Sequence, residues 1–191
     1  NNAFKLIQPE IIPFISYPYE WCFSQLKDAA LITLKIQKIA LEYGMSLKDA
    51  SAYNIQFHMG KPILIDTLSF EKYEEGRPWV AYRQFCQHFL SPLALMSKKD
   101  IRLNQLLRIY IDGIPLDLAS KVLPKSGFMS FFLFMHIYLH AKTQAHFADR
   151  SVDVRGKKLS KLSLLGIIEN LDKAIKKLNW KPKGTEWSDY Y

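Results

Sequence analysis

Three polar residues in the first third of the chain have the types and spacing that phosphoryl transfer requires. Asp49 is followed after five residues by Asn54, and after twelve more by Asp66. In such a reaction one carboxylate orients the attacking hydroxyl, while an amide oxygen and a second carboxylate hold Mg²⁺ against the phosphates. On this hypothesis Asp49 is the catalytic base, and Asn54 and Asp66 are the metal ligands.

The elements predicted around these residues would bring Asn54 and Asp66 together. Two β-like runs, residues 54–57 and 62–65, flank a glycine-containing reversal, which indicates a hairpin. Asn54 opens the first run and Asp66 follows the second, so both would lie at the same end of the hairpin, close to the loop that carries Asp49. A helix over residues 25–43, with Ser24 as N-cap and Gly44 as its stop, precedes that loop. The charges of this helix fall on one narrow arc, so we expect it to be a buried central helix.

This arrangement resembles the catalytic loop and the metal-binding aspartate of the protein-kinase-like superfamily, including its small-molecule kinases. The resemblance implies the fold of a kinase C-terminal lobe. Two features of that superfamily are missing. The sequence has no Gly-x-Gly-x-x-Gly loop and no lysine-bearing strand ahead of the motif, and only about two dozen residues precede the long helix. We therefore expect a kinase-like domain that is catalytically inactive.

A second resemblance covers nearly the whole chain and rests on several longer motifs. These are ISYPYEW (15–21), SAYNIQF (51–57), GKP (60–62), LIDTLSFE (64–71), WVAYRQF (79–85) and TEWSDYY (185–191). They are similar to the region ahead of the catalytic domain in bacterial class I S-adenosylmethionine-dependent methyltransferases related to nodulation proteins. The resemblance implies a downstream methyltransferase domain in the same polypeptide. S-adenosylmethionine would bind in that domain, because this chain has no glycine-rich strand-to-helix turn for it.

Beyond the hairpin, helices are predicted over residues 79–90, 99–111, 117–123, 128–147 and 160–178. Further candidate residues lie on the first and fourth of these helices. Arg83, Gln84 and His88 follow Asp66 closely and are candidate contacts to the acceptor substrate; internal hydrogen bonds are the alternative. His136 and His140 share a helix face at metal-ligand spacing, yet the glutamate of a zinc-binding His-Glu-x-x-His motif is absent. Half-buried, hydrogen-bonded histidines are therefore the favoured interpretation.

Composition and charge limit the class of protein. Hydrophobic residues make up 49% of the 191 residues, which is enough for a core and excludes a disordered chain. Two cysteines give no disulfide framework, no leader is apparent, and no apolar run is long enough to span a bilayer. We therefore expect a cytoplasmic protein. Of the net charge of +8, residues 151–183 carry +6, from nine Lys/Arg and three Asp/Glu. This segment is either a solvated helix face or a surface for an anionic partner.

Taken together, these patterns predict an α+β, mostly helical fold. Residues 1–123 would form the kinase-like core with its small hairpin sheet, and residues 124–191 a basic helical extension. The function expected first is an accessory domain that positions the substrate or the catalytic domain of a methyltransferase and holds no cofactor itself. One alternative is the C-terminal lobe of an Mg-ATP-dependent small-molecule phosphotransferase. A second is a nucleic-acid-binding adaptor that uses residues 151–183. The acceptor substrate is not identified by the sequence.

Overall fold

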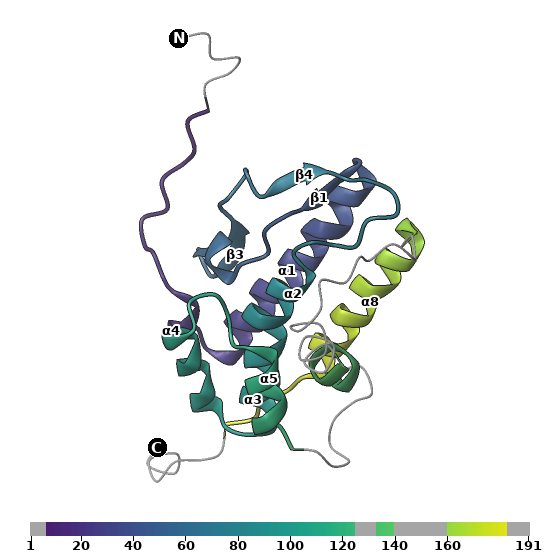
Figure 1. Ribbon diagram of the computed structural model, residues 1–191. Coiled ribbons are helices and arrows are strands. Elements are labelled where there is room, and N and C mark those ends of the chain that lie inside the picture. The colour runs from purple at the N-terminus through teal and green to yellow at the C-terminus, as the bar shows by residue number, and fades with distance from the viewer. Residues whose placement is uncertain (1–6, 125–132, 140–159, 183–191) are drawn as a thin grey trace.

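The structure of the protein is a computed structural model, which describes residues 7–124, 133–139 and 160–182. A long helix runs through its centre (Figure 1). This helix, α1, spans Phe23–Glu42. Its N-cap is Cys22, whose backbone N–H donates to Oε1 of Gln25 at 3.0 Å. The predicted N-cap, Ser24, was wrong: it lies inside the first turn, because the helix begins two residues earlier. The predicted stop at Gly44 is confirmed within one residue.

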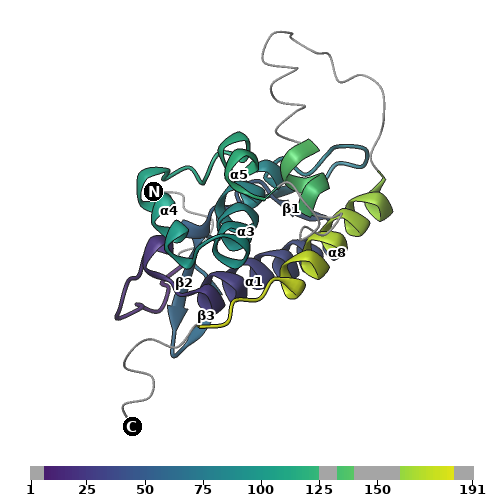
Figure 2. The ribbon, with the colours of Figure 1, turned by 90° about the horizontal axis from the view of Figure 1, so that it is seen from below.

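Two further helices pack against α1 and enclose the core (Figures 1 and 2). They are α3, Ser91–Lys98, and α8, Lys161–Lys177, which begins at its N-cap Ser160. The α1–α8 contact also has a polar part, since Nζ of Lys27 donates to the carbonyls of Lys176 and Leu178 at 2.9 and 2.8 Å. A cation at the C-terminal end of α8 complements the partial negative charge there. The apolar residues of all three helices form one continuous core.

The helix that leads into α3 is longer than predicted and changes its winding. The prediction ended it at Leu90, but the chain runs as α2, Tyr82–Phe85, then as a π-helical turn, Cys86–Leu90, and then directly as α3. Pro92 falls in the first turn of α3, where a missing N–H is tolerated. Leu90 is therefore not a helix end.

Two small antiparallel sheets flank the helices. The strands β2, Ile55–His58, and β3, Lys61–Leu64, pair as a hairpin in which Ile55 opposes Leu64. Its turn is Met59-Gly60, both with positive φ, as a two-residue hairpin turn requires. The predicted hairpin is thus confirmed with its strands shifted by one residue. The second sheet was not predicted and joins β1, Met45–Leu47, to β4, Phe70–Lys72.

The remaining described helices are short. Residues Ile101–Gln105 form a 3-10 helix that continues into α4, Leu106–Ile109. The helix α5 spans Leu116–Val122, and Phe134–Leu139 is a π-helical segment. The predicted helices over 99–111, 117–123 and 160–178 correspond to described elements with altered ends, whereas the helix predicted over 128–147 lies mostly outside the described residues. The α+β, mostly helical class is confirmed.

The predicted division at residues 123 and 124 stays a prediction, although α8 contributes buried side chains to the same core as α1. Across the described residues, no helix is both long enough and apolar enough to cross a membrane.

Candidate functional site

The loop between β1 and β2 carries the predicted catalytic residues, and polar bonds hold both of its ends. At its start, the backbone N–H of Lys48 donates to the carbonyl of Ser69 at 2.8 Å. At its end, the N–H of Ile65 donates to the carbonyl of Asn54 at 2.9 Å, which extends the hairpin ladder. The loop is therefore fixed against the segment that follows the hairpin.

The strand β1 before this loop is fixed by one buried side chain of α1. Gln37 is fully buried; its Nε2 donates to Oγ of Ser46 at 3.0 Å, and its Oε1 accepts from the N–H of Leu47 at 2.7 Å. A buried amide is stable only with such partners. Gln37 thus ties the central helix to the strand that introduces Asp49.

Asn54 and Asp66, the predicted metal ligands, are brought together through Ser69. The side-chain Nδ2 of Asn54 donates to Oγ of Ser69 at 3.0 Å, and that hydroxyl donates to Oδ2 of Asp66 at 2.8 Å. The other carboxylate oxygen of Asp66 accepts from the N–H of Leu68 at 2.8 Å. Ser69 itself is buried. The two residues therefore belong to one hydrogen-bonded cluster at the end of the hairpin.

Asp49, the predicted catalytic base, lies at the other end of the loop and bonds within it. Its Oδ1 accepts from the N–H of Ser51 at 2.8 Å. The next residue, Ala50, donates its N–H to Oε1 of Gln84 at 2.7 Å. This bond gives Gln84, a candidate substrate contact, a defined structural role in joining α2 to the loop.

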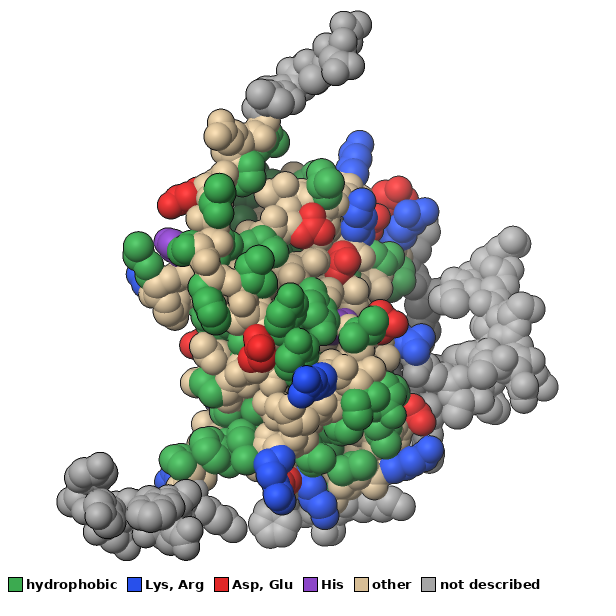
Figure 3. All heavy atoms as spheres, turned by 90° about the vertical axis from the view of Figure 1, so that its left-hand side faces the viewer, with side chains coloured by type: hydrophobic (Ala, Val, Ile, Leu, Met, Phe, Trp, Pro, Cys, Tyr) green, Lys and Arg blue, Asp and Glu red, His purple; other side chains and the backbone are tan. Residues whose placement is uncertain are grey.

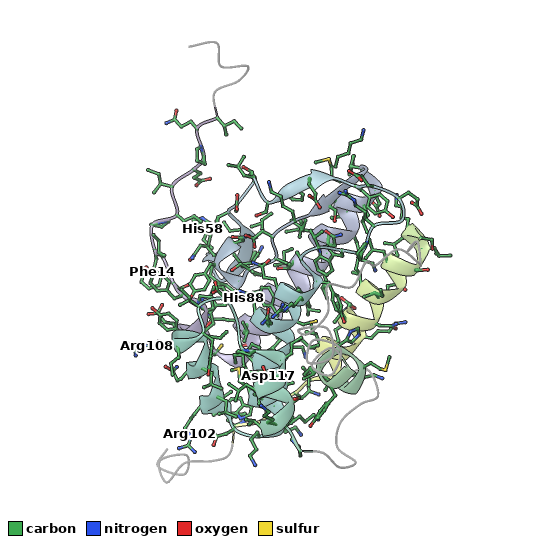
Figure 4. All side chains as sticks on the ribbon, viewed as in Figure 1. Phe14, His58, His88, Arg102, Arg108 and Asp117 are labelled. Carbon is green, nitrogen blue, oxygen red and sulfur yellow. The ribbon has the colours of Figure 1, made fainter. Side chains whose placement is uncertain are left out.

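His88 lies on the π-helical turn, in the middle of the molecule (Figure 4). Its side chain is 2% exposed, and its Nδ1 is buried without a hydrogen-bond partner. The ring of Tyr53 meets it edge to face, with the ring centroids 6.2 Å apart. Burial lowers the pKa of His88 to about 4 against the opposing influence of Asp49 and Asp112, so the imidazole is neutral at pH 7. Asp49 and Asp112 therefore lie within electrostatic range of the His88 ring.

A glycine contact brings the Asp112 loop to this position. Gly113 has φ +89°, and a Cβ there would lie 2.7 Å from Cβ of Gln87. The following N–H, of Ile114, donates to the carbonyl of Gln87 at 2.9 Å. Only glycine permits this approach, and the approach places Asp112 beside the helix turn that carries His88.

Two other residues that the sequence singles out, Arg83 and His136, lie on α2 and on the π-helical segment Phe134–Leu139. Arg83 is on the exposed side of α2, one residue before Gln84. His136 is buried and forms a short hydrogen bond with the hydroxyl of Tyr82 through its Nδ1, as the favoured interpretation expected. His140 is outside the described residues. Burial raises the pKa of the Cys86 thiol to about 12, which keeps it protonated at neutral pH.

Two residues that the structure adds to the candidate site, Ser69 and Asp112, did not emerge from the sequence pattern. A signal existed for Asp112, because Asp-Gly marks a turn, and a weaker one for Ser69, three residues after Asp66. Within residues 7–124, 133–139 and 160–182, no group of three His, Cys, Asp or Glu side chains is arranged to hold a metal ion. Of the basic segment 151–183, the structure describes residues 160–182, most of them in α8.

Comparison with known proteins gives one informative relationship. No protein-family model matches the chain, and no solved structure matches it significantly. The chain is 42% identical over 141 residues to the nodulation protein NoeA of Rhizobium meliloti (strain 1021). The match covers 74% of this chain and 30% of that protein. The chain is therefore related to a nodulation protein along most of its own length, and it spans less than a third of that relative.

Proposed function

We propose that this chain is an accessory, non-catalytic domain with the architecture of a kinase C-terminal lobe. In this proposal it belongs to a larger polypeptide whose S-adenosylmethionine-dependent methyltransferase domain lies outside these residues. The accessory domain positions the acceptor substrate or the catalytic domain. It binds neither S-adenosylmethionine nor Mg-ATP itself.

The order of the elements supports the kinase-like architecture. A long buried helix, α1, leads into a strand, then into the loop from Asp49 to Asn54, then into the hairpin, and then to Asp66. The residues expected to hold a metal in that architecture, Asn54 and Asp66, lie one hydroxyl apart.

The Asn54–Ser69–Asp66 chain of hydrogen bonds is the observation that carries the non-catalytic assignment. Both carboxylate oxygens of Asp66 accept bonds from its own chain, and the amide of Asn54 donates to the same hydroxyl. An Mg²⁺ site needs carboxylate and amide oxygens directed at one point with several waters. Here a buried serine occupies the position between the two side chains, so the cluster is satisfied without a cation.

The relationship to a longer protein supports the larger polypeptide. The chain corresponds to 30% of the relative it matches, which leaves most of that protein for other domains. The motifs similar to methyltransferases of the nodulation-related group give the proposed chemistry of the neighbouring domain. The methyl acceptor stays undefined.

Titration calorimetry of the 191-residue chain with Mg-ATP tests the non-catalytic assignment. A kinase-like site lacking its upper half loses at least two charge-assisted bonds of about 1.5–3 kcal/mol each. A micromolar complex near −8 kcal/mol would then weaken to about millimolar or beyond. We expect no saturable heat with Mg-ATP, and none with S-adenosylmethionine. For the intact gene product, we expect saturable S-adenosylmethionine binding.

The phosphotransferase is the second candidate, favoured by the proximity of Asn54 and Asp66. It predicts saturable Mg-ATP binding at about 10–100 µM, abolished by Asp66→Asn. The matched control is Asp117→Asn, which changes an exposed carboxylate on α5 (Figure 4). Binding lost in the first variant and kept in the second would replace the accessory domain with the phosphotransferase.

A further inference from the structure

An extended apolar arm leaves the body of the molecule at its N-terminal side. We define the arm as residues 7–15 (Figure 1). Four of its large apolar side chains are exposed, Ile7 at 78%, Ile11 at 86%, Phe14 at 72% and Ile15 at 63%, while Ile12 is half-buried. None of the residues 7–15 makes a hydrogen bond or an ion pair with another described residue. An isolated extended segment of this kind gains nothing from exposing its apolar side chains to water.

The root of the arm, by contrast, is firmly held. The N–H of Ser16 donates to Oε1 of Gln56 at 3.0 Å, and Nε2 of Gln56 donates back to the carbonyl of Ser16 at 2.9 Å. The indole N–H of Trp21 donates to Oγ of Ser16 at 2.8 Å. The arm therefore leaves the body from a fixed point.

Exposed apolar side chains continue from the arm's root to the end of α4. The 3-10 helix Pro18–Glu20 follows the root and contacts α4, with the guanidinium of Arg108 over the ring of Tyr19 at 5.7 Å. Ile109 and Ile111, just beyond Arg108, are 73% and 63% exposed. Figure 4 shows Phe14 and Arg108 on the same side of the molecule, and Figure 3 shows hydrophobic side chains spread over that side.

We propose that this arm surface, defined as Ile11, Phe14, Ile15, Ile109 and Ile111, is where the rest of the same polypeptide docks. The proposal rests on the proposed function in one respect, that the polypeptide is longer than this chain. Contiguous exposed apolar patches mark interaction sites in soluble proteins. A domain in the same polypeptide reaches such a patch at high effective concentration, so that even a modest apolar interface suffices.

Two observations favour this occupant over a second copy of the chain. The relative leaves 70% of its length outside the matched region, so a covalently linked partner is available in that protein. A dimer would instead bring together two chains that each carry a net charge of +8, and that repulsion opposes association.

The arm surface also adjoins the candidate site. Tyr17 stacks on Tyr19 with the ring centroids 5.5 Å apart. Burial raises the pKa of Tyr53, with further contributions from Tyr19, Asp112 and Tyr17, so each of these three groups lies within electrostatic range of Tyr53. The ring of Tyr53 contacts that of His88, which belongs to the candidate site. A domain docked on the arm surface would therefore lie beside the loop that carries Asp49.

Carbene footprinting of the intact gene product tests the docking directly. A photoactivated diazirine probe labels accessible side chains, and mass spectrometry reads the labelling residue by residue. Leu162 and Tyr43, both exposed and on other elements, serve as internal references. We expect labelling of Phe14 and Ile109 to be several-fold lower than at the references. Labelling at the level of the references would overturn the proposal.

A pair of variants identifies the occupant. Ile109→Asp places a charge on the arm surface and should raise labelling of Phe14 several-fold, whereas Leu162→Asp should leave it unchanged. Protection of Phe14 that disappears on dilution, together with a dimer mass by light scattering, would assign the surface to a second copy and overturn the proposal. S-adenosylmethionine binding is measured separately. If the intact gene product does not bind S-adenosylmethionine but Phe14 is still protected from labelling, the methyltransferase assignment is refuted and the docking proposal stands.

Discussion

The helical core and the loop–hairpin region hold their shapes by different interactions. Around α1, α3 and α8 the buried groups are almost all apolar, with Leu34, Leu93 and Ile168 close to fully buried. In the region from β1 to β4, hydrogen bonds from a few polar side chains hold the backbone in place. Gln37 of α1 and Gln84 of α2 bond the backbone at Leu47 and Ala50. Ser69 bonds Asn54, which lies fifteen residues earlier.

This difference determines how each region responds to substitution. Apolar burial is shared among many neighbours and is insensitive to pH, so its loss is costly wherever it occurs. A hydrogen-bonded loop depends on single residues, each of which contributes less to stability but fixes the position of a functional group. Variants in the two regions should therefore separate effects on stability from effects on the site.

The largest expected effect is in the core. Leu34→Ala removes a side chain that is 1% exposed on α1 and should lower the free energy of unfolding by about 2–5 kcal/mol, through lost burial and the cavity left behind. Urea denaturation measures this value. Ile39→Ala, on the exposed side of the same helix, is the control. A loss below about 0.5 kcal/mol for Leu34→Ala would mean that α1 is peripheral.

The second largest expected effect is a fall in the free energy of unfolding at acidic pH, caused by the buried His88. The folded-state pKa of His88, about 4, lies below its ordinary value of 6.5, so the unfolded chain takes up the proton first. The contribution of His88 to stability is complete above pH 6.5 and is lost as the pH falls toward 4. It amounts to about 3 kcal/mol.

Urea denaturation at several pH values, with NMR titration of the His88 ring, measures this dependence. His88→Gln should flatten the fall in stability between pH 6.5 and 4. A His88 resonance that titrates at or above pH 6.5 would contradict the buried, neutral imidazole.

Substitution of Ser69 should have a smaller effect on stability but the clearest effect on cation binding at the site. Ser69→Ala removes the bridge between Asn54 and Asp66 and should cost about 1–2 kcal/mol. With the bridge gone, the Asp66 carboxylate and the Asn54 amide are free to reorient toward a cation. We expect Mn²⁺ to broaden the NMR signals of residues 54 and 66 more strongly in this variant than in the parent chain. Equal broadening in both proteins would show that Ser69 does not close the site.

The smallest effect is expected at the polar rim of the α1–α8 contact. The Lys38–Glu169 ion pair, at 3.3 Å, is partly exposed on both sides, and Lys38→Met should change the unfolding free energy by no more than about 0.5 kcal/mol. Ile168→Ala, in the buried part of the same contact, should cost several times more. A double-mutant cycle with Glu169→Gln isolates the pair; a coupling above about 1 kcal/mol would show that charge contributes substantially to this interface.

Part of the site was predictable because its determinants are local. The Met59-Gly60 reversal between two β-like runs fixes the hairpin, and the hairpin alone brings Asn54 toward Asp66. The pairing of β1 with β4 was missed because each strand has three residues, and neither run carries a turn signal that points to the other. The extension of the helix beyond Leu90 was missed because the π-helical turn leaves no sequence signature that periodicity detects.

By itself, the sequence determined the central helix, the hairpin, the α+β class and the identities of the polar residues near the loop, since periodicity and turn chemistry act over a few residues. Only the tertiary structure decided what those polar residues do. It placed Ser69 between Asn54 and Asp66, gave Gln84 to the backbone of the loop, and brought Asp112 to His88 through Gly113. The Gln84 and Gly113 contacts join segments that meet only through tertiary packing, and Ser69 finds its partners at the end of the hairpin. A buried polar group takes whichever partner the final packing presents to it.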